Sequence, residues 1–172
     1  MPYDLEKLKE RIKDSKIRQG ILFCFGDSFI SKVIQLKTRL TKDEIVPSHV
    51  AMIFNESLYE STSAPEKVGN KRIPSGVRRY LLKDFFKIEQ DKNTKYYFYD
   101  MTLSERLLDK YIHLPYGKDT IVDFLVKEAS TGDSKGLICS QYTNAVTGLL
   151  KEPCPTPADL YRKVLEIIEK EG

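Results

Sequence analysis

Three side chains of types used in nucleophilic catalysis stand far apart along the chain: His49, Glu60 and Cys139. Cys139 lies where an apolar run passes into an amphipathic helix. A thiol in the first turn of a helix meets the positive end of the helix dipole and unpaired N–H groups, and both favour the reactive thiolate. The alternative is plain packing, because free cysteine is among the most buried residue types. A nucleophilic cysteine also needs a base, and the base needs a group that orients it.

The chain offers two histidines as the base. His49 opens the apolar run "HVAMIF", so a strand beginning there would place its imidazole at a sheet edge, or leave it as a half-exposed strand residue. His113 precedes the break "LPYG" at a helix end, where a histidine usually meets terminal carbonyls. Cys24, inside an apolar run, and Cys154, between two prolines, are interpreted as structural. His49 is therefore the preferred partner of the thiol.

Glu60 is the candidate orienting group. A two-residue turn at Asn55 and Glu56 would set His49 opposite Thr62. His49 and Glu60 would then share one face of the hairpin as diagonal neighbours ~7–8 Å apart. A carboxylate there would fix the imidazole tautomer and stabilise its charged form. A loop with an odd number of residues would instead send Glu60 to the other face, as a solvent-facing strand carboxylate. Together the three side chains describe a cysteine hydrolase or acyl transferase with the order His, Glu, Cys.

Hydrophobic periodicity and capping residues predict helices at both ends of the chain. The cysteine segment is expected to be helical from Cys139 to Leu150. The other predicted helices are one capped by Asp4 and ended by Gly20, one capped by "GDS" and carrying Phe29 to Leu40, one with a capping box of Thr102 and Glu105 that runs to Ile112, one capped by Asp119 over "TIVDFLVKEA", and one capped by Thr156 with Pro157 in its first turn.

Strands are expected mainly in the middle of the chain. The runs "ILFCF", "HVAMIF", "SLYEST" and "KYYFYDM" have the apolar and aromatic content of strands, whereas "GVRRYLLKDFFK" is ambiguous between strand and short helix. Residues 63–75 are expected to form a long surface loop. Its Lys67, Lys71 and Arg72 form either a rim that selects acidic groups or an ordinary solvated surface. This arrangement predicts an α+β fold with an antiparallel sheet backed by helices.

Length and composition narrow the class of protein. The 172 residues fit one domain spanning 1–172, with an N-terminal helical segment at 1–19 and a C-terminal helix at 156–172. The net charge is only +3 and basic residues are spread among acidic ones, so nucleic acid is not indicated as a partner. Three cysteines without close pairing argue against a disulfide scaffold, and two histidines argue against structural zinc, so we expect no metal and no cofactor.

The charged N-terminus does not resemble a signal peptide, and no apolar run approaches the ~18 residues of a membrane span. We therefore expect no membrane span and a cytoplasmic location, with another release route left open.

Several short stretches, taken in order, cover most of the chain from Gly20 to Leu160 and read "GILFCFGDSFISKVIQLKT", "SHVAMIF", "LYEST", "GVRRY", "LPYGKDTIVDFL", "LICSQYTNAV" and "TPADL". This ordered set resembles the circularly permuted NlpC/P60 proteins, a papain-like group that includes the YiiX-like hydrolases. In the unpermuted family the cysteine precedes the histidine, whereas here His49 comes ninety residues before Cys139, as the permuted arrangement implies.

The resemblance implies a papain-like core, with the central sheet packed against the cysteine helix. It implies Cys139 as nucleophile, His49 as general base and Glu60 as the polar third member. Tyr116, in "PYG", matches a recurrent aromatic position and either lines the substrate cleft or packs. Gln141 stands two places after the cysteine, where many members carry glutamate, and is expected to bind substrate or alter local hydrogen bonds. The resemblance also places oxyanion donors among the backbone N–H groups at the start of the cysteine helix.

The expected function is hydrolysis of an amide bond by a Cys-His-Glu triad. The resemblance implies a small peptide or amide as substrate, either a cell-wall-type peptide derived from peptidoglycan or a related small amide. Several members begin with a signal or lipoprotein peptide and this sequence does not, which weakens a wall-facing role. Two alternatives stay open: a lipid-directed thiol acyltransferase or hydrolase of the same fold, and a catalytically inactive binding module that kept the pocket.

Overall fold

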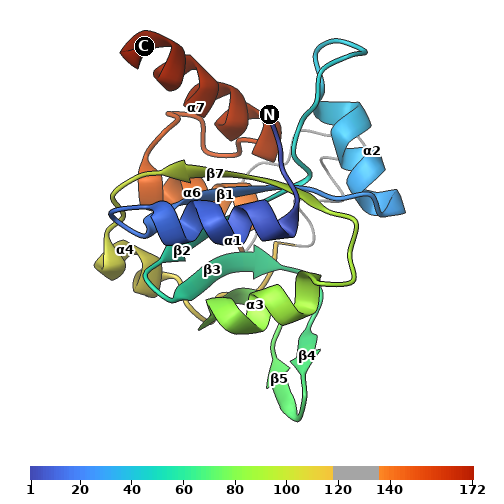
Figure 1. The fold of residues 1–172 in the computed structure, drawn as a ribbon, viewed down its shortest axis with the longest axis vertical. Helices are drawn as coiled ribbons and strands as arrows, with labels where there is room; N and C mark the ends of the chain where they lie inside the picture. The colour runs from blue at the N-terminus through green and yellow to red at the C-terminus, as the bar shows by residue number, and fades with distance from the viewer. Residues whose placement is uncertain (118–135) are drawn as a thin grey trace.

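The computed structural model describes residues 1–117 and 136–172. Its centre is a five-stranded antiparallel sheet in the order β6-β3-β2-β1-β7, and a separate hairpin pairs β4 with β5 (Figure 1). The expected α+β class with an antiparallel sheet is therefore confirmed. The strands are β1 (Gln19–Phe25), β2 (His49–Phe54), β3 (Ser57–Thr62), β4 (Glu66–Val68), β5 (Lys71–Ile73), β6 (Gly76–Leu81) and β7 (Lys95–Asp100).

Helices cover both faces of the sheet. In Figure 1, α1 crosses in front of the strands with α3 beside it, whereas α6 lies behind them. The predicted helix over residues 120–129, with its Asp119 cap, falls outside the described residues. The described helices are α1 (Leu5–Asp14), α2 (Phe29–Thr38), α3 (Leu82–Glu89), α4 (Glu105–Lys110), α6 (Cys139–Thr147) and α7 (Pro157–Glu171).

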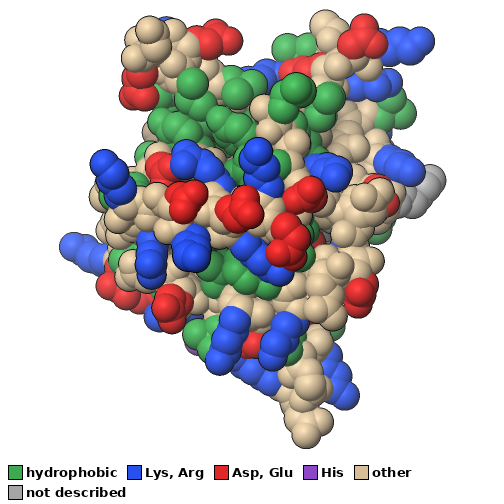
Figure 2. Space-filling view, in the orientation of Figure 1, with side chains coloured by type: hydrophobic (Ala, Val, Ile, Leu, Met, Phe, Trp, Pro, Cys, Tyr) green, Lys and Arg blue, Asp and Glu red, His purple; other side chains and the backbone are tan. Residues whose placement is uncertain are grey.

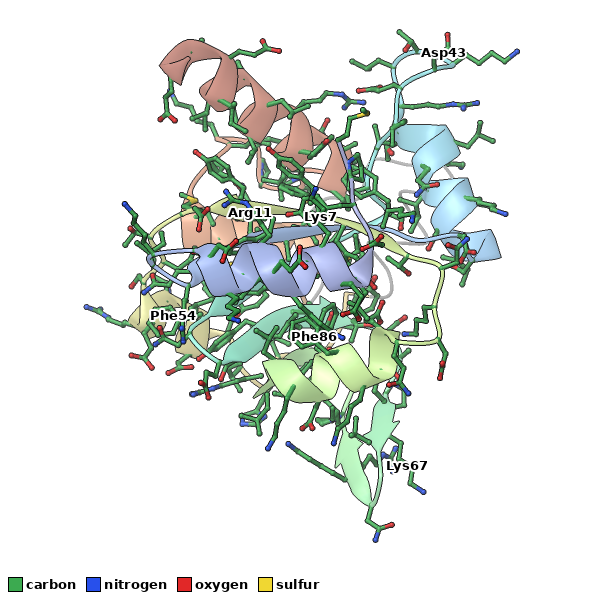
Figure 3. All side chains as sticks on the ribbon, in the orientation of Figure 1. Lys7, Arg11, Asp43, Phe54, Lys67 and Phe86 are labelled. Atoms are coloured by element: carbon green, nitrogen blue, oxygen red, sulfur yellow. The ribbon has the colours of Figure 1, made fainter. Side chains whose placement is uncertain are left out.

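The two faces of the sheet bury different parts of each strand, because successive side chains point to opposite faces. Ala51 and Ile53 of β2 belong to the cluster under α1 and α3. Val50 packs in the cluster that contains α7 residues, and Met52 packs with Tyr142 of α6. In Figure 3, Phe86 lies between α1 and α3, where it packs against the first cluster. The sheet is thus the middle layer, and β2 touches both outer layers.

The segment after β3 is more ordered than the expected surface loop. Residues 63–75 carry the β4–β5 hairpin, which projects from one end of the molecule, with Lys67 far from the sheet (Figures 1 and 3). The ambiguous stretch "GVRRYLLKDFFK" contains both candidate elements, since β6 ends at Leu81 and α3 begins at Leu82. The β4–β5 hairpin is called the arm from here on. Figure 2 shows Lys, Arg, Asp and Glu side chains interspersed over the face that α1 presents.

Several predicted helix boundaries were wrong, among them that of the helix expected to carry Leu40, since α2 ends at Thr38. The helix expected to start with a Thr102 capping box begins after Ser104, whose hydroxyl accepts from the Leu107 N–H. That helix ends at Lys110 rather than at Ile112. The cysteine helix ends at Thr147 instead of Leu150, because Gly148 adopts the left-handed conformation that closes helices. None of the helices among residues 1–117 and 136–172 is long and apolar enough to cross a membrane.

Gly20 was predicted to end the first helix, and this prediction was wrong. The helix stops at Asp14, and Gly20 lies inside β1, paired with Asp100 of β7. A Cβ built on Gly20 would lie 2.1 Å from the carbonyl oxygen of Tyr99 and 2.8 Å from the Phe98 ring. The glycine is therefore required by the close approach of β7 and not by a helix end.

We predict that Gly20→Ala destabilises the protein by about 3 kcal/mol, because the added methyl meets backbone that cannot move away alone. Gly69→Ala is the control: its site is open, and its positive φ costs only about 1 kcal/mol. Urea unfolding of both variants measures the difference. Equal losses for the two variants would contradict the close-approach explanation.

Candidate active site

The β2–β3 hairpin has the register that the two-residue turn predicted. Phe54 pairs with Ser57 and Met52 with Tyr59. Asn55 adopts a φ of 55°, the left-handed conformation that asparagine tolerates in such turns. His49 Nε2 lies 2.7 Å from Glu60 Oε2, so the imidazole and the carboxylate share a hydrogen bond.

Glu60 is held from its other oxygen as well. Its side chain is buried, and Oε1 accepts from Arg78 Nη2 at 2.6 Å, Arg78 Nε at 3.0 Å and the Tyr80 hydroxyl at 2.9 Å. Arg78 stands directly opposite Glu60 across the β3–β6 pair, and Tyr80 follows it two residues later on the same face. Because Oε1 already accepts three hydrogen bonds, Oε2 is the oxygen that remains for His49.

Arg78 also fixes the base of the arm. Its Nη1 donates to the carbonyl oxygens of Ala64 at 2.9 Å and Pro74 at 3.0 Å, one before β4 and one after β5. Arg78 is only 5% exposed, so all of these contacts are sheltered from water. Neither Arg78 nor Tyr80 was predicted as a site residue from the sequence. The alternation of Arg78 and Tyr80 in "GVRRYL" was the available signal, but it has meaning only once that stretch is known to pair with "SLYEST".

Cys139 is the first residue of α6 and is 7% exposed. The segment that leads to it is anchored by hydrogen bonds from three directions. The Leu137 N–H donates to Pro115 O at 3.1 Å, the hydroxyl of Ser61 donates to Leu137 O, and the Ile138 N–H donates to Gln141 Oε1 at 3.0 Å. Ser61 belongs to β3, so the same strand that presents Glu60 also positions the start of the cysteine helix.

The thiol and the imidazole interact directly. The pKa shifts show the coupling: His49 lowers the pKa of the Cys139 thiol through its charge and hydrogen bonding, the Val50 and Ser140 backbone N–H groups lower it further, and Cys139 in turn raises the pKa of His49. Because Glu60 occupies Nε2, Nδ1 is the ring nitrogen that remains for the thiol. His49 is the first residue of β2, so its ring can reach the sulfur over the end of the strand although Cys139 comes from the α6 side.

The ionisation of the three groups is strongly coupled. Burial opposes the charged forms of all three, but their partners outweigh it. The charge and hydrogen bond of His49 lower the pKa of the Cys139 thiol, and Cys139 and Glu60 together raise the pKa of His49. His49 and Arg78 bring the pKa of Glu60 down to about 2. These pKa shifts favour a thiolate–imidazolium pair, and the thiolate is the form of cysteine that attacks carbonyl carbon.

Two cavities adjoin this group. The smaller one, about 280 Å³, is lined by Cys139, His49 and Tyr116 and by apolar side chains of α2. The larger one, about 610 Å³, is lined by His49, Glu60 and Arg78 and by charged residues of the α3–β7 connection. They share a wall made of Ser28, Ser31, Ser48, His49 and Thr62. Tyr116 therefore lines the same cavity as the thiol. Contact of Tyr116 with a substrate stays a prediction.

Gln141 does not line either cavity. Its Oε1 accepts from the Ile138 N–H at the start of α6, and its Nε2 lies 3.1 Å from the sulfur of Cys154. Its contacts are those of a helix cap, although substrate binding by Gln141 stays a prediction. His113 is exposed and has no place in the group, and Cys24 is buried. Within residues 1–117 and 136–172, no cluster of His, Cys, Asp or Glu could hold a metal ion.

Comparisons with protein-family models, with curated proteins and with solved structures found no match for this chain. The class of site rests on the arrangement itself. A thiol at a helix start, an imidazole bonded to it and a carboxylate bonded to the imidazole form the combination used for nucleophilic catalysis.

We predict that Cys139 is alkylated by iodoacetamide with a pH midpoint clearly below the ~8.5 of free cysteine. The rate rises through the pKa of the thiol, which His49 lowers, so His49→Ala should move the midpoint upward. Mass spectrometry of the Cys139 peptide measures the rate, and the exposed Cys154 in the same sample serves as the reference thiol. An ordinary midpoint for Cys139 would make it an inert core thiol.

We predict that Arg78→Lys destabilises the protein by about 2 kcal/mol, because lysine cannot reproduce the fork that binds Glu60 and the arm. It should also raise the alkylation midpoint of Cys139, since a loosened Glu60 positions His49 less well. Arg79→Lys, at the neighbouring exposed position, is the matched control and should cost under about 0.5 kcal/mol. Equal effects of the two substitutions would exclude this role for Arg78.

Proposed function

We propose that this protein is a cysteine hydrolase that cleaves an amide bond. The observation that carries the proposal is the position of His49, which bonds Glu60 through Nε2 and interacts with the Cys139 thiol. Burial alone would make both ionised forms unfavourable, so a pair of this kind inside a protein needs a compensating arrangement. The fork of Arg78 on Glu60 supplies part of that arrangement.

The proposed reaction has two halves. The Cys139 thiolate attacks the amide carbonyl carbon, so that the carbon–sulfur bond forms as the carbonyl electron pair moves onto oxygen. The tetrahedral oxyanion then collapses, and the carbon–nitrogen bond breaks. The protonated His49 gives its proton to the leaving nitrogen. Water then adds to the thioester and transfers a proton to His49, and the carbon–sulfur bond breaks to release the acid and the thiolate. Glu60 stabilises the imidazolium and holds its orientation throughout. Backbone N–H groups at the start of α6, including that of Cys139, are the proposed oxyanion donors.

The proposed fold family is papain-like, of the circularly permuted NlpC/P60 type. Support comes from α6, which starts at Cys139 and packs on β2 and β3, and from the order of His49 before Cys139 in the chain. The resemblance makes a small cell-wall-type peptide or a related amide the proposed substrate. A binding module without turnover is disfavoured because the thiol, imidazole and carboxylate are all present and in contact.

One observation favours the lipid-directed alternative. Ile30 and Leu36 of α2 are 66% and 60% exposed, and Leu40 and Ile45 after it are exposed as well. Ile30 also lines the cavity of Cys139. Apolar side chains at the mouth of a reactive site are suited to an acyl chain or a lipid surface. In this reading the same thiol would accept the acyl group of a lipid ester or amide.

We predict that the protein releases amine from a small peptide or acyl-amide panel, and that Cys139→Ala lowers kcat/KM by at least about 10³-fold. Glu60→Gln should lower it by about 10²-fold because the imidazole loses its charged partner. Cys154→Ser, at an exposed position outside both cavities, is the control and should retain activity.

Muropeptides and phospholipid vesicles assayed side by side separate the two substrates. Fatty-acid release from the vesicles, without amine release from the muropeptides, would favour the lipid alternative. Absence of any release that depends on Cys139 would leave the binding module.

A further inference from the structure

The arm is too small to keep its shape by itself. Its two strands have three residues each, and an isolated two-stranded hairpin is at best marginally stable in water. The arm lies beside α3 at one end of the molecule (Figure 1), and β4 contacts that helix. Its order must therefore come from contacts between the arm and the rest of the protein.

Apolar packing and an ion pair dock the arm on the body of the protein. Ile73 is buried in the cluster under α1 and α3, and Val68 packs against the same cluster. Lys71 Nζ lies 3.3 Å from Asp84 Oδ2 in the first turn of α3. Asp84 is itself buried, and a carboxylate is costly to bury without a cation beside it. The docked position of β5 is therefore favoured by both contacts.

The arm is tied to the candidate active site through Arg78. One guanidinium nitrogen, Nη1, donates to Ala64 O and Pro74 O, where the chain enters and leaves the arm. The other two nitrogens donate to Oε1 of Glu60. A guanidinium is planar and rigid, so it cannot follow a moved acceptor at one end and keep its geometry at the other. Displacement of the arm base therefore weakens the hold on Glu60.

The path from the docking contacts to the arm base is short and stiff. Ile73 directly precedes Pro74, whose ring fixes its own φ and favours extended backbone at the residue before it. Lys71 stands two residues before Ile73 on the paired strand β5. A change in how β5 lies on α3 therefore reaches the Pro74 carbonyl with few rotatable bonds between.

Resting on the proposed function, we propose that Lys71 and Ile73 are positioning residues of the active site, which act through the guanidinium of Arg78. Docking of the arm keeps Glu60 in the orientation that holds the imidazole. Neither Lys71 nor Ile73 lines either cavity, so their effect does not come from contact with a substrate. With a looser arm Glu60 is free to turn, and the imidazolium beside the thiolate is held less well.

Lys71→Ala and Ile73→Ala test the proposal by loosening the arm in two unrelated ways. We expect the backbone amides of residues 66–73 to exchange hydrogen faster in both variants. The pH midpoint of Cys139 alkylation should rise in both, by about half a pH unit in Lys71→Ala, the size that a partly exposed ion pair can transmit. With an amide substrate, both variants should lower kcat several-fold and leave KM unchanged, because neither residue lines a cavity.

Three control variants separate positioning from other effects. Lys71→Arg keeps the cation and should keep the midpoint of the unchanged protein. Lys67→Ala alters an exposed residue of the same arm, far from the sheet in Figure 3, and should leave the midpoint where it is. Gly20→Ala destabilises the contact of β1 with β7, at the opposite edge of the sheet from β6, and should not move the midpoint either. A shift in Lys67→Ala or Gly20→Ala as large as in the arm variants would overturn the positioning role.

The midpoint of the unchanged protein separates this inference from the proposed function. A low midpoint that stays low in both arm variants, although their arm amides exchange faster, would overturn the positioning role alone. Arm amides that exchange no faster would mean that Lys71 and Ile73 do not dock the arm, and would overturn that role as well. An ordinary thiol midpoint before any substitution would overturn the proposed function, and the positioning role with it.

Discussion

The candidate site depends on one buried carboxylate. Glu60 is 6% exposed, and ionised side chains are rarely buried without partners because removing them from water is costly. Here Arg78 and Tyr80 donate to one carboxylate oxygen of Glu60, and His49 bonds the other, so both oxygens have hydrogen-bond partners. The carboxylate that orients the imidazole is therefore itself fixed in place by Arg78 and Tyr80. Without Arg78, the hydrogen bond to His49 would be one of several arrangements open to Glu60.

The four charged groups alternate in sign along a row. In its ion-pair form, the Cys139 thiolate meets the His49 imidazolium, which meets the Glu60 carboxylate, which meets the Arg78 guanidinium. Each charge has only opposite charges as bonded neighbours, and the row as a whole is neutral. A neutral, alternating row is far less costly to bury than any isolated member of it. The row also continues to the arm, because Arg78 Nη1 bonds Ala64 O and Pro74 O at its two ends.

Local patterns predicted much of this arrangement. The strand runs, the Asp4 and Thr156 caps and the parity of the β2–β3 hairpin depend on neighbouring residues, and the structure confirms them. Features that depend on distant chain were missed. Gly20 is required by the Tyr99 carbonyl of β7, and the partner of Arg78 is separated from it by the whole arm. The two cavities were equally beyond reach, because their walls come from segments spread between Cys24 and Pro157.

The position of His49 at the end of β2 explains how residues from opposite layers can meet. Glu60 and Arg78 share the sheet face with Leu58 and Tyr80, under α3, whereas Cys139 packs with Val50 on the side of α7. Within a strand the backbone would separate the two sets of side chains. At the first residue no further strand intervenes, so the ring of His49 can bond Glu60 on one side and Cys139 on the other. A group in that position lies in the wall between the two cavities, where Glu60 holds Nε2 and leaves Nδ1, on the thiol side, as the ring nitrogen free to exchange a proton.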